Sequence, residues 1–284
     1  MDKLIVKSPA KINIGLNIIR KKNDRYHDIE TIFYPLLLSD ILSFKKSNKT
    51  KLASNSNEVK NLDNNIIFEA IRILEEHSGK KLGTEIFLEK NIPIGAGLGG
   101  GSSNAAATLK AINHLYKLNL NYKTLSELAL ALGSDVPYFL NPVACYASSR
   151  GEILNKINLY LSQPILLLNP GINISTKWAF EQLTLSNQPG NLSHLSSQKI
   201  ITVEDIKRFA TNDFEDIVFK KYPEISLIKE QLYSLGAEFA LMTGTGSTVY
   251  GIFSNLQKAK WAKEDFENKY FTFLNFPVDH GSIT

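Results

Sequence analysis

The pattern of hydrophobic and polar residues predicts strands at the start of the chain and mixed elements after them. Residues 4–19 alternate apolar and polar positions and are interrupted by Pro9, so they predict two strands joined by a bend. Residues 31–44, rich in Ile, Phe and Leu, predict another strand pair. Over residues 64–79, Ile67, Ile71 and Leu74 recur at helical spacing and Gly79 supplies a stop, so this segment predicts a helix. Residues 84–88 predict a strand that leads into a glycine-rich segment.

The order of predicted elements changes after about residue 155. Residues 124–127 read Thr-Leu-Ser-Glu, a capping-box pattern that opens a helix ending at Gly133. After about residue 155 we expect strands over 164–169, 239–242, 248–253 and 271–276, and helices over 176–185, 203–210, 213–221, 224–235 and 256–269. Without the inserted helices this is the β-α-β-β-α-β order of a ferredoxin-like domain. Residues 186–199 predict a surface loop.

Composition and charge narrow the class of protein. The 284 residues are 43% hydrophobic, which suits a soluble globular protein of one large or two moderate domains. The net charge is +4, but the basic residues are scattered, so a solvated surface is favoured over a nucleic-acid footprint and we expect no nucleic-acid partner. Cys145 is the only cysteine, which excludes an intrachain disulfide, and its apolar neighbours predict a small core residue.

Targeting and metal signals are not found along the chain. No apolar run reaches the roughly 18 residues of a membrane span, and the first residues lack the features of a signal peptide. We therefore expect a cytoplasmic protein without a membrane partner. The five histidines are dispersed and no metal-ligand spacing occurs. A monomer and a weak homodimer are both compatible with the sequence.

The most informative segment is Pro-Ile-Gly-Ala-Gly-Leu-Gly-Gly-Gly-Ser-Ser-Asn at residues 93–104. Glycine lets the backbone take φ > 0 and approach a ligand closely. The alanine-rich residues 105–111 follow and predict a helix, which the Ser and Asn residues can cap. Exposed N–H groups at a helix N-terminus form a phosphate site. A linker or tight turn is the alternative.

Two familiar phosphate loops fit this segment poorly. A P-loop that starts at Gly95 would need Lys where Gly101 stands. The dinucleotide fingerprint fits Gly95, Gly97 and Gly100, but residues 117–121 lack the acidic residue expected about 20 positions later. A dinucleotide-dependent oxidoreductase therefore remains as a weak alternative.

A third pattern, Pro-x-x-x-Gly-Leu followed by glycine and paired serines, resembles the phosphate loop of the GHMP kinases, the family of galactokinase, homoserine kinase and mevalonate kinase. The lengthened loop is similar to one branch, which phosphorylates a cytidine-diphosphate-linked sugar alcohol in non-mevalonate isoprenoid precursor biosynthesis. The resemblance implies an α+β fold of two domains. The first, over 1–155, would be a ribosomal-protein-S5-domain-2-like ATP-binding domain, and the second, over 156–284, a ferredoxin-like domain.

The resemblance also implies an ATP site. Asn65 and Lys90 align with residues that line the adenine pocket, and the hydroxyl of Ser102 could reach Mg²⁺, with no metal cage built by the protein alone. The phosphate-binding residues would be Pro93, Ile94, Gly95, Ala96, Gly97, Leu98, Gly99, Gly100, Gly101, Ser102 and Ser103. ATP and Mg²⁺ are thus the expected cofactors.

Two residues are implied to be catalytic. Asp135 lies in Leu-Gly-Ser-Asp-Val-Pro-Tyr-Phe at residues 132–139; its setting alone favours a helix N-cap, but the resemblance implies the base that takes the acceptor's proton. Lys11 lies in Pro-Ala-Lys-Ile-Asn at residues 9–13, where a lone lysine is normally solvated. The resemblance instead places Lys11 beside Asp135, where it would keep the carboxylate ionised and polarise the reacting oxygens.

The implied acceptor site combines polar and aromatic residues. Asn13 would orient the substrate, Tyr26 would stack on the cytosine and His27 would hydrogen-bond its edge, although such a Tyr-His pair alone usually belongs to surface or packing. Phe180, four residues after Thr176, matches a second stacking aromatic, with a helix core residue as the alternative. Residues 242–249 resemble a third glycine motif, whose Gly244 and Gly246 would close over phosphates. Residues 212–215 resemble an Asn-Asp-Leu-Glu helix start.

The sequence leaves one close alternative, a GHMP kinase for another alcohol such as homoserine or mevalonate. Such an enzyme would have no use for Tyr26, His27 and Phe180. The chain also departs from the family pattern, with Ser134 in place of Ala, Asp24 in place of Gly, Asn141-Pro142 within a Gly-rich stretch, and Ser149 in a Gly-Arg-Gly-Glu type turn. None of these departures is an implied catalytic group.

Overall fold

The computed structural model describes residues 3–22, 26–60, 65–183 and 192–277 and confirms an α+β fold. The chain forms two compact units. The first comprises Met1–Ala10, Leu38–Ile92 and Gly99–Pro142, and the second Lys11–Leu37, Pro93–Leu98 and Val143–Thr284. The domain boundary expected at residue 155 stays a prediction.

Two long strands contribute residues to both units. Strand β1 spans Leu4–Lys21 and β2 spans His27–Lys46, so the predicted bend at Pro9 and the predicted strand pair over 31–44 are wrong. Within the described residues, β1 pairs with β2 and with no other strand. One edge of β1 therefore forms no ladder, and a proline, which lacks an N–H donor, is tolerated in an edge strand.

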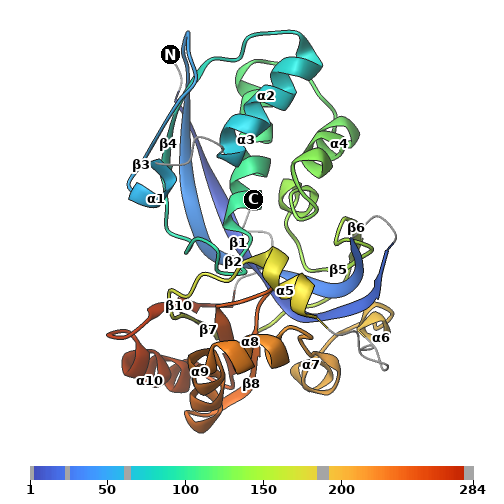
Figure 1. Cartoon of the computed structure of the whole chain (residues 1–284), viewed down its shortest axis with the longest axis vertical. Helices are drawn as coiled ribbons and strands as arrows, with labels where there is room; N and C mark the ends of the chain where they lie inside the picture. The colour runs from blue at the N-terminus through green and yellow to red at the C-terminus, as the bar shows by residue number, and fades with distance from the viewer. Residues whose placement is uncertain (1–2, 23–25, 61–64, 184–191, 278–284) are drawn as a thin grey trace. The chain divides into compact units, whose positions relative to one another are not determined.

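The first unit combines sheet and helices. Strand β4 (Thr84–Glu89) pairs antiparallel with β2 and parallel with the short β3 (Lys51–Ser54), which the sequence did not predict. Helices α2 (Ile66–Ser78), α3 (Gly100–Leu115) and α4 (Tyr122–Leu132) pack on one another beside these strands (Figure 1). The unit also holds α1 (Asn57–Lys60) and a 3₁₀ helix at Pro137–Leu140.

Side-chain caps fix two of these helices. Asn65 caps α2 by accepting a hydrogen bond from the N–H of Ile67, and Gly79 ends the helix in the left-handed conformation, as predicted. The predicted capping box at 124–127 is wrong, because Asn121 is the cap of α4 and accepts from the N–H of Thr124. Gly133 ends α4 as predicted.

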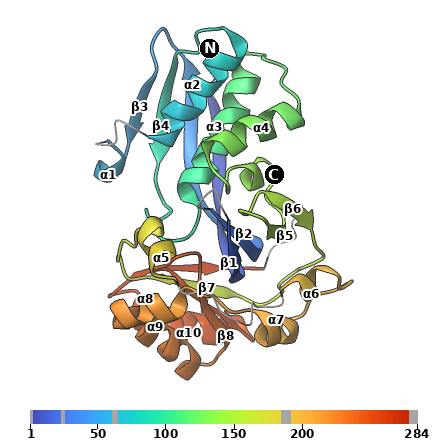
Figure 2. The same cartoon turned by 45° about the vertical axis from the view of Figure 1, so that its right-hand side comes forward.

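The second unit contains the predicted ferredoxin-like domain. Strands β7 (Ile165–Asn169), β8 (Ala237–Met242), β9 (Val249–Phe253) and β10 (Phe271–Asn275) form an antiparallel sheet in the order β10-β7-β9-β8. Helices α8 (Glu215–Lys221), α9 (Pro223–Ser234) and α10 (Leu256–Phe266) lie along one side of this sheet (Figure 2). The unit also contains β5 (Cys145–Ser148), β6 (Ile153–Lys156), α5 (Thr176–Gln182) and α7 (Val203–Phe209).

The loop predicted over 186–199 is only partly described. Residues 186–191 lie outside the described residues, and Ser193–Ser196 forms the short helix α6 rather than loop.

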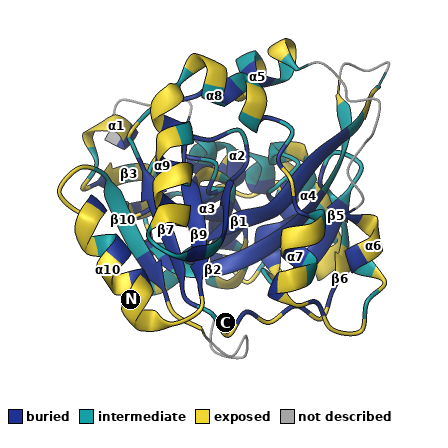
Figure 3. Ribbon diagram, turned by 90° about the horizontal axis from the view of Figure 1, so that it is seen from below, coloured by how far each residue is buried: buried dark blue, intermediate teal, exposed yellow. Residues whose placement is uncertain are grey.

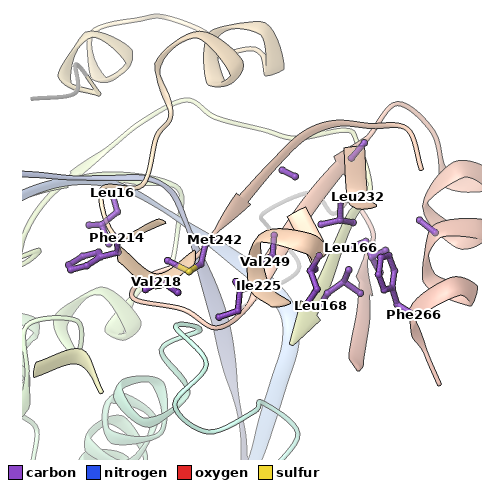
Figure 4. Packing of buried hydrophobic residues seen from close by; sticks show 14 of the residues in the cluster. Leu16, Leu166, Leu168, Phe214, Val218, Ile225, Leu232, Met242, Val249 and Phe266 are labelled. Carbon is purple, nitrogen blue, oxygen red and sulfur yellow. The ribbon is translucent and has the colours of Figure 1, made fainter. Parts of the chain in front are cut away.

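Apolar side chains hold the ferredoxin-like sheet and its helices together. Strands β7 and β9 are buried along their length, whereas α9 and α10 expose one face (Figure 3). Between them lies a cluster contributed by each of these elements, with Phe214 and Leu16 at one end and Phe266 at the other (Figure 4). Burying apolar surface is the main stabilising term in such a core. Among the described helices, none is long and apolar enough to cross a membrane.

Candidate active site

The N-terminus of α3, in the first unit, has the properties of an anion site. Gly99 is the N-cap in the left-handed conformation (φ 73°) and provides no side-chain cap, so the predicted capping by Ser or Asn is wrong. The N–H groups of Gly100, Gly101 and Ser102 donate to no acceptor in the described part of the chain. Unpaired donors at a helix N-terminus bind phosphate groups. These residues therefore fit the polyphosphate of a nucleotide.

The two serines of this helix differ in their surroundings. Ser103 is buried and its Oγ accepts a hydrogen bond from Ser8 Oγ at 2.8 Å. Ser102 is half-buried, and its hydroxyl has no hydrogen-bond partner among the residues described. Ser102 is therefore the serine of the pair whose hydroxyl fits a ligand or a metal ion.

Lys90 forms a buried ion pair in the first unit. Its ammonium lies 2.8 Å from Asp40 Oδ2 and also contacts the carbonyl of Ile92. Burial lowers the pKa of Lys90, and the carboxylate of Asp40 opposes that shift. Asp40 also accepts from the N–H groups of Asn91 and Ile92 at 2.7 and 2.8 Å, so it anchors these two residues of the first unit.

Asp135 lies in the turn between α4 and the 3₁₀ helix. The turn is closed by a hydrogen bond from the N–H of Val136 to the carbonyl of Gly133. The N-cap of the 3₁₀ helix is Val136, with no side-chain cap, so the N-cap role favoured for Asp135 by its setting alone is wrong. The carboxylate is half-buried.

Lys11, in the second unit, is 3% exposed, which corrects the expectation of a solvated strand residue. Its ammonium donates to Asn13 Oδ1 at 2.5 Å and to the carbonyl of Gly97 at 3.0 Å. Its backbone N–H donates to the carbonyl of Leu98. Strand β1 therefore holds the first glycine loop through both the backbone and the side chain of Lys11.

The loop 93–98 packs directly on the second glycine loop, residues 243–246. A Cβ atom added to Gly97 (φ +76°) would lie 2.2 Å from the carbonyl oxygen of Thr243, and one added to Gly244 would lie 3.1 Å from the Cα of Gly97. The hydroxyl of Thr243 lies 3.3 Å from the carbonyl oxygen of Gly97 and accepts from the N–H of Asn13 at 2.9 Å. The glycines thus permit contact between two backbones, and the threonine joins both loops to β1.

Asn212 holds the second glycine loop by hydrogen bonds to its backbone. It was not predicted as a site residue. Its Nδ2 donates to the carbonyls of Met242 and Gly244 at 2.7 and 2.9 Å, while its Oδ1 accepts from the N–H of Phe214. The signal in the sequence was the Asn-Asp-Phe-Glu motif. Gly246, at φ +92°, completes the turn of this loop.

Aromatic residues gather at the expected acceptor site of the second unit. His27 stacks on Phe180 with ring centroids 4.9 Å apart and an interplanar angle of 30°, and Phe180 in turn packs edge-on against Phe214. Burial, together with the charge of Lys21, lowers the pKa of His27 below its ordinary value of 6.5. The imidazole is therefore neutral at pH 7 and can both donate and accept hydrogen bonds.

Tyr26 and Thr176 lie nearer the surface. Tyr26 is 51% exposed, and the guanidinium of Arg150 lies 4.6 Å from its ring centroid. Thr176, at the start of α5, places its Oγ1 3.4 Å from Thr245 Oγ1. Asp24, one of the departures from the family pattern, lies outside the described residues.

The departure at Ser149 has a local compensation. Ser149 has φ +61°, a conformation that favours glycine. Its hydroxyl donates to Glu152 Oε1 at 3.1 Å, and the N–H of Arg150 donates to Glu152 Oε2 at 2.7 Å. The carboxylate of Glu152 thereby braces the turn that carries Arg150.

A dedicated metal cage is not found in the described ranges, where no three His, Cys, Asp or Glu residues are grouped to hold an ion. Mg²⁺ in phosphoryl-transfer enzymes is held largely by substrate phosphates and water with one or two protein oxygens. The Ser102 hydroxyl fits such a role.

Both parts of the chain are similar to known proteins. Residues 65–142 match the family described as GHMP kinases N terminal domain, and residues 199–272 match GHMP kinases C terminal. The chain is 39% identical over 273 residues to 4-diphosphocytidyl-2-C-methyl-D-erythritol kinase of Thermodesulfovibrio yellowstonii, covering 93% of this chain and 94% of that protein. It is 36% identical over 271 residues to the kinase of the same name from Syntrophomonas wolfei, covering 94% and 95%.

A solved structure is similar over nearly the whole chain. The crystal structure of 4-(cytidine 5'-diphospho)-2C-methyl-D-erythritol kinase superposes with a TM-score of 0.80 at 28% identity, covering 96% of this chain and 98% of that one. The two family models match residues 65–142 and 199–272, and relatives more than 30% identical cover almost the full length. This chain belongs to the GHMP kinase family.

Proposed function

We propose that this protein transfers the γ-phosphoryl group of ATP to the 2-hydroxyl of 4-(cytidine 5′-diphospho)-2-C-methyl-D-erythritol. The products are the 2-phosphate and ADP, and the reaction belongs to isoprenoid precursor biosynthesis by the non-mevalonate pathway. The observation that carries the proposal is the 36–39% identity, over more than nine-tenths of the chain, to kinases named for this substrate. The stacked aromatic pair of His27 and Phe180 supports the same acceptor.

ATP is bound by the residues around the start of α3. The unpaired N–H groups of Gly100, Gly101 and Ser102 receive its phosphate oxygens, and the positive end of the helix dipole favours their charge. The Ser102 hydroxyl would hold Mg²⁺, which would supply positive charge to neutralise the phosphates. Asn65 and Lys90 line the adenine pocket through their backbone and side-chain stems, since the cap of α2 engages the amide oxygen of Asn65 and the ion pair with Asp40 engages the ammonium of Lys90.

Asp135 and Lys11 perform the chemistry. Asp135 accepts the proton of the attacking hydroxyl, which makes that oxygen a better nucleophile as it bonds to the γ-phosphorus. Lys11 stabilises the negative charge that develops on the phosphoryl oxygens. The hydrogen bonds of Lys11 to Asn13 and Gly97 hold its ammonium in place, so little reorganisation is needed during the reaction.

The cytosine base is recognised in the second unit. Tyr26 and Phe180 provide aromatic faces for stacking, and the neutral imidazole of His27 hydrogen-bonds the base edge. The guanidinium of Arg150 lies over the Tyr26 ring in a cation–π contact. Asn13, Thr176, Gly244 and Gly246 contact the remainder of the acceptor.

A coupled ADP-release assay tests the proposal. Purified protein and Mg-ATP are offered the cytidyl-methylerythritol substrate, with homoserine, mevalonate and galactose as controls. Turnover with the cytidyl substrate alone is expected, and CDP should compete with it. Turnover with a control alcohol alone would reject the cytidine site but keep the kinase chemistry.

A variant at Phe180 sharpens the assay. Phe180→Leu retains an apolar side chain but removes the ring, so the KM for the cytidyl substrate should rise about tenfold, in line with base–aromatic stacking energies of about 1–3 kcal/mol. The KM for ATP should stay unchanged. An equal rise in both KM values would show that Phe180 has only a packing role.

A further inference from the structure

Thr31 is a buried polar residue that no motif marks and that lies beside the residue implied to orient the substrate. It is on β2, is fully buried, and its backbone is paired with Ala147 of β5. On the neighbouring strand β1, Asn13 is also buried, at 3% exposure. Asn13 Nδ2 and Thr31 Oγ1 are 2.8 Å apart.

The single proton of the Thr31 hydroxyl decides which way the Asn13 amide faces. Thr31 Oγ1 lies 2.6 Å from the carbonyl oxygen of Gly15, which can only accept, so the hydroxyl proton is given to Gly15. Toward Asn13 the hydroxyl can then act only as an acceptor. The amide nitrogen must face Thr31, and the amide oxygen must face the other way.

The opposite side of the Asn13 amide meets Lys11. Asn13 Oδ1 accepts from the Lys11 ammonium at 2.5 Å and lies 3.3 Å from Thr243 Oγ1. Were the amide reversed, its N–H₂ group would point at the ammonium, and two donors would face each other in a buried site. Lys11 would then lose an acceptor and shift from its place against Gly97.

We propose that Thr31 is a positioning residue: its hydroxyl fixes the orientation of the Asn13 amide and, through Asn13, the place of the Lys11 ammonium during phosphoryl transfer. This inference rests on the proposed function, in which Lys11 and Asn13 serve the reaction. Thr31 itself is screened from the substrate by full burial and acts only through its neighbours.

Two variants of Thr31 separate its hydroxyl from its shape. Thr31→Val keeps the volume and removes the hydroxyl, so kcat should fall about 10-fold to 100-fold, the effect of a misplaced group in an active site. Thr31→Ser keeps the hydroxyl and should retain kcat within about threefold. The matched control is Thr84→Val, because Thr84 is also fully buried in a strand and its hydroxyl donates to a backbone carbonyl, that of Leu82.

The comparison of these variants decides the question. Thr31→Val and Thr84→Val should lower the unfolding temperature similarly, but only Thr31→Val should lower kcat at saturating substrates. In an Asn13→Ala background, Thr31→Val should reduce kcat no further, because the Asn13 amide through which Thr31 positions Lys11 is already absent. Wild-type kcat in Thr31→Val, or the same fall on top of Asn13→Ala, would overturn the proposal.

A spectroscopic measurement keeps the inference testable if Thr31→Val does not fold or if the wild-type protein phosphorylates no acceptor. The side-chain amide protons of Asn13 should show a nuclear Overhauser effect to the Thr31 side chain and exchange slowly with solvent. Amide protons that lie instead beside the Lys11 side chain, or that exchange rapidly, would overturn the proposed orientation. Absence of turnover with these contacts intact would reject the proposed function and leave the orientation of Asn13 standing.

Discussion

Replacing Gly97 with alanine should disrupt the contact between the two glycine loops. The added Cβ would lie 2.2 Å from the carbonyl oxygen of Thr243, and ordinary contact begins at 3.4 Å, so one loop must retreat by about 1.2 Å. The obstacle is backbone and cannot rotate away as a side chain would. A shift of this size also moves the carbonyl of Gly97 away from the ammonium of Lys11.

Two contributions determine how much unfolding free energy the Gly97→Ala variant should lose. The left-handed conformation of residue 97 costs alanine about 1–2 kcal/mol, and overpacking adds about 1–3 kcal/mol. Gly97→Ala should therefore lose about 2–5 kcal/mol of unfolding free energy. Because a misplacement of about 1 Å can cost about 100-fold in rate, kcat/KM should fall by a similar factor.

Gly79→Ala is the matched control for these measurements. Gly79 has φ +67°, but an added Cβ meets nothing within 4 Å, so this variant carries the backbone strain without the clash. Urea unfolding and steady-state kinetics of both variants provide the comparison. If Gly97→Ala is no less stable than Gly79→Ala and keeps the wild-type kcat/KM, the close contact between the loops is refuted.

Four further predictions concern charged or titratable groups. Asp135→Asn should lower kcat by about 10²–10⁴-fold while leaving ATP affinity nearly unchanged in a binding assay, and an equal loss of both would argue for a structural role. Asp40→Ala leaves the ammonium of Lys90 buried without its partner, so urea unfolding should show a loss of about 3–5 kcal/mol; a loss below about 1 kcal/mol would contradict the importance of the pair. Burial raises the pKa of Cys145 to about 12, so a thiol reagent should label it only after unfolding, and labelling of the native protein at pH 8 would be inconsistent with this burial. The pKa of His27 is lowered in the folded state, so the contribution of neutral His27 to stability is complete above pH 6.5 and is lost as the pH falls through the lowered pKa. An NMR titration of His27 with a midpoint above pH 6.5 would contradict this prediction.

Local signals in the sequence were sufficient to predict most helices and the strands of the ferredoxin-like sheet. The apolar spacing and the terminal Gly79 located α2 because both act within a few residues. The break predicted at Pro9 was wrong because only the pairing of β1, with a strand along one edge alone, shows that a residue without an N–H donor can stand in this strand. The short strand β3 went unnoticed because its pairing with β4, not its own composition, makes it a strand.

In the candidate site, too, features with a local sequence pattern were predicted and features that depend on distant contacts were not. The glycine loop and the start of α3 were predicted, because a glycine run before helix formers is a local pattern. The burial of Lys11 was not, because its partners come from Asn13 and from a carbonyl 86 residues away. Thr31 and Thr243 gave no local signal either, since their hydrogen bonds to Asn13 span 18 and 230 positions.

The backbone contact between Gly97 and Gly244 has a consequence for how the fold can be inferred from related sequences. Methods that detect contacts by correlated substitution need both positions to vary. The 2.2 Å clash of an added Cβ at residue 97 and the left-handed backbone of residue 244 (φ +60°), where an added Cβ would lie 3.1 Å from Gly97, both favour glycine. If glycine alone is accepted at both positions, neither varies and the pair gives no correlation. An alignment would then contain no correlated substitutions that indicate this contact between loops 147 residues apart. Replacing each position by every other residue, with glycine alone surviving selection, would reveal it.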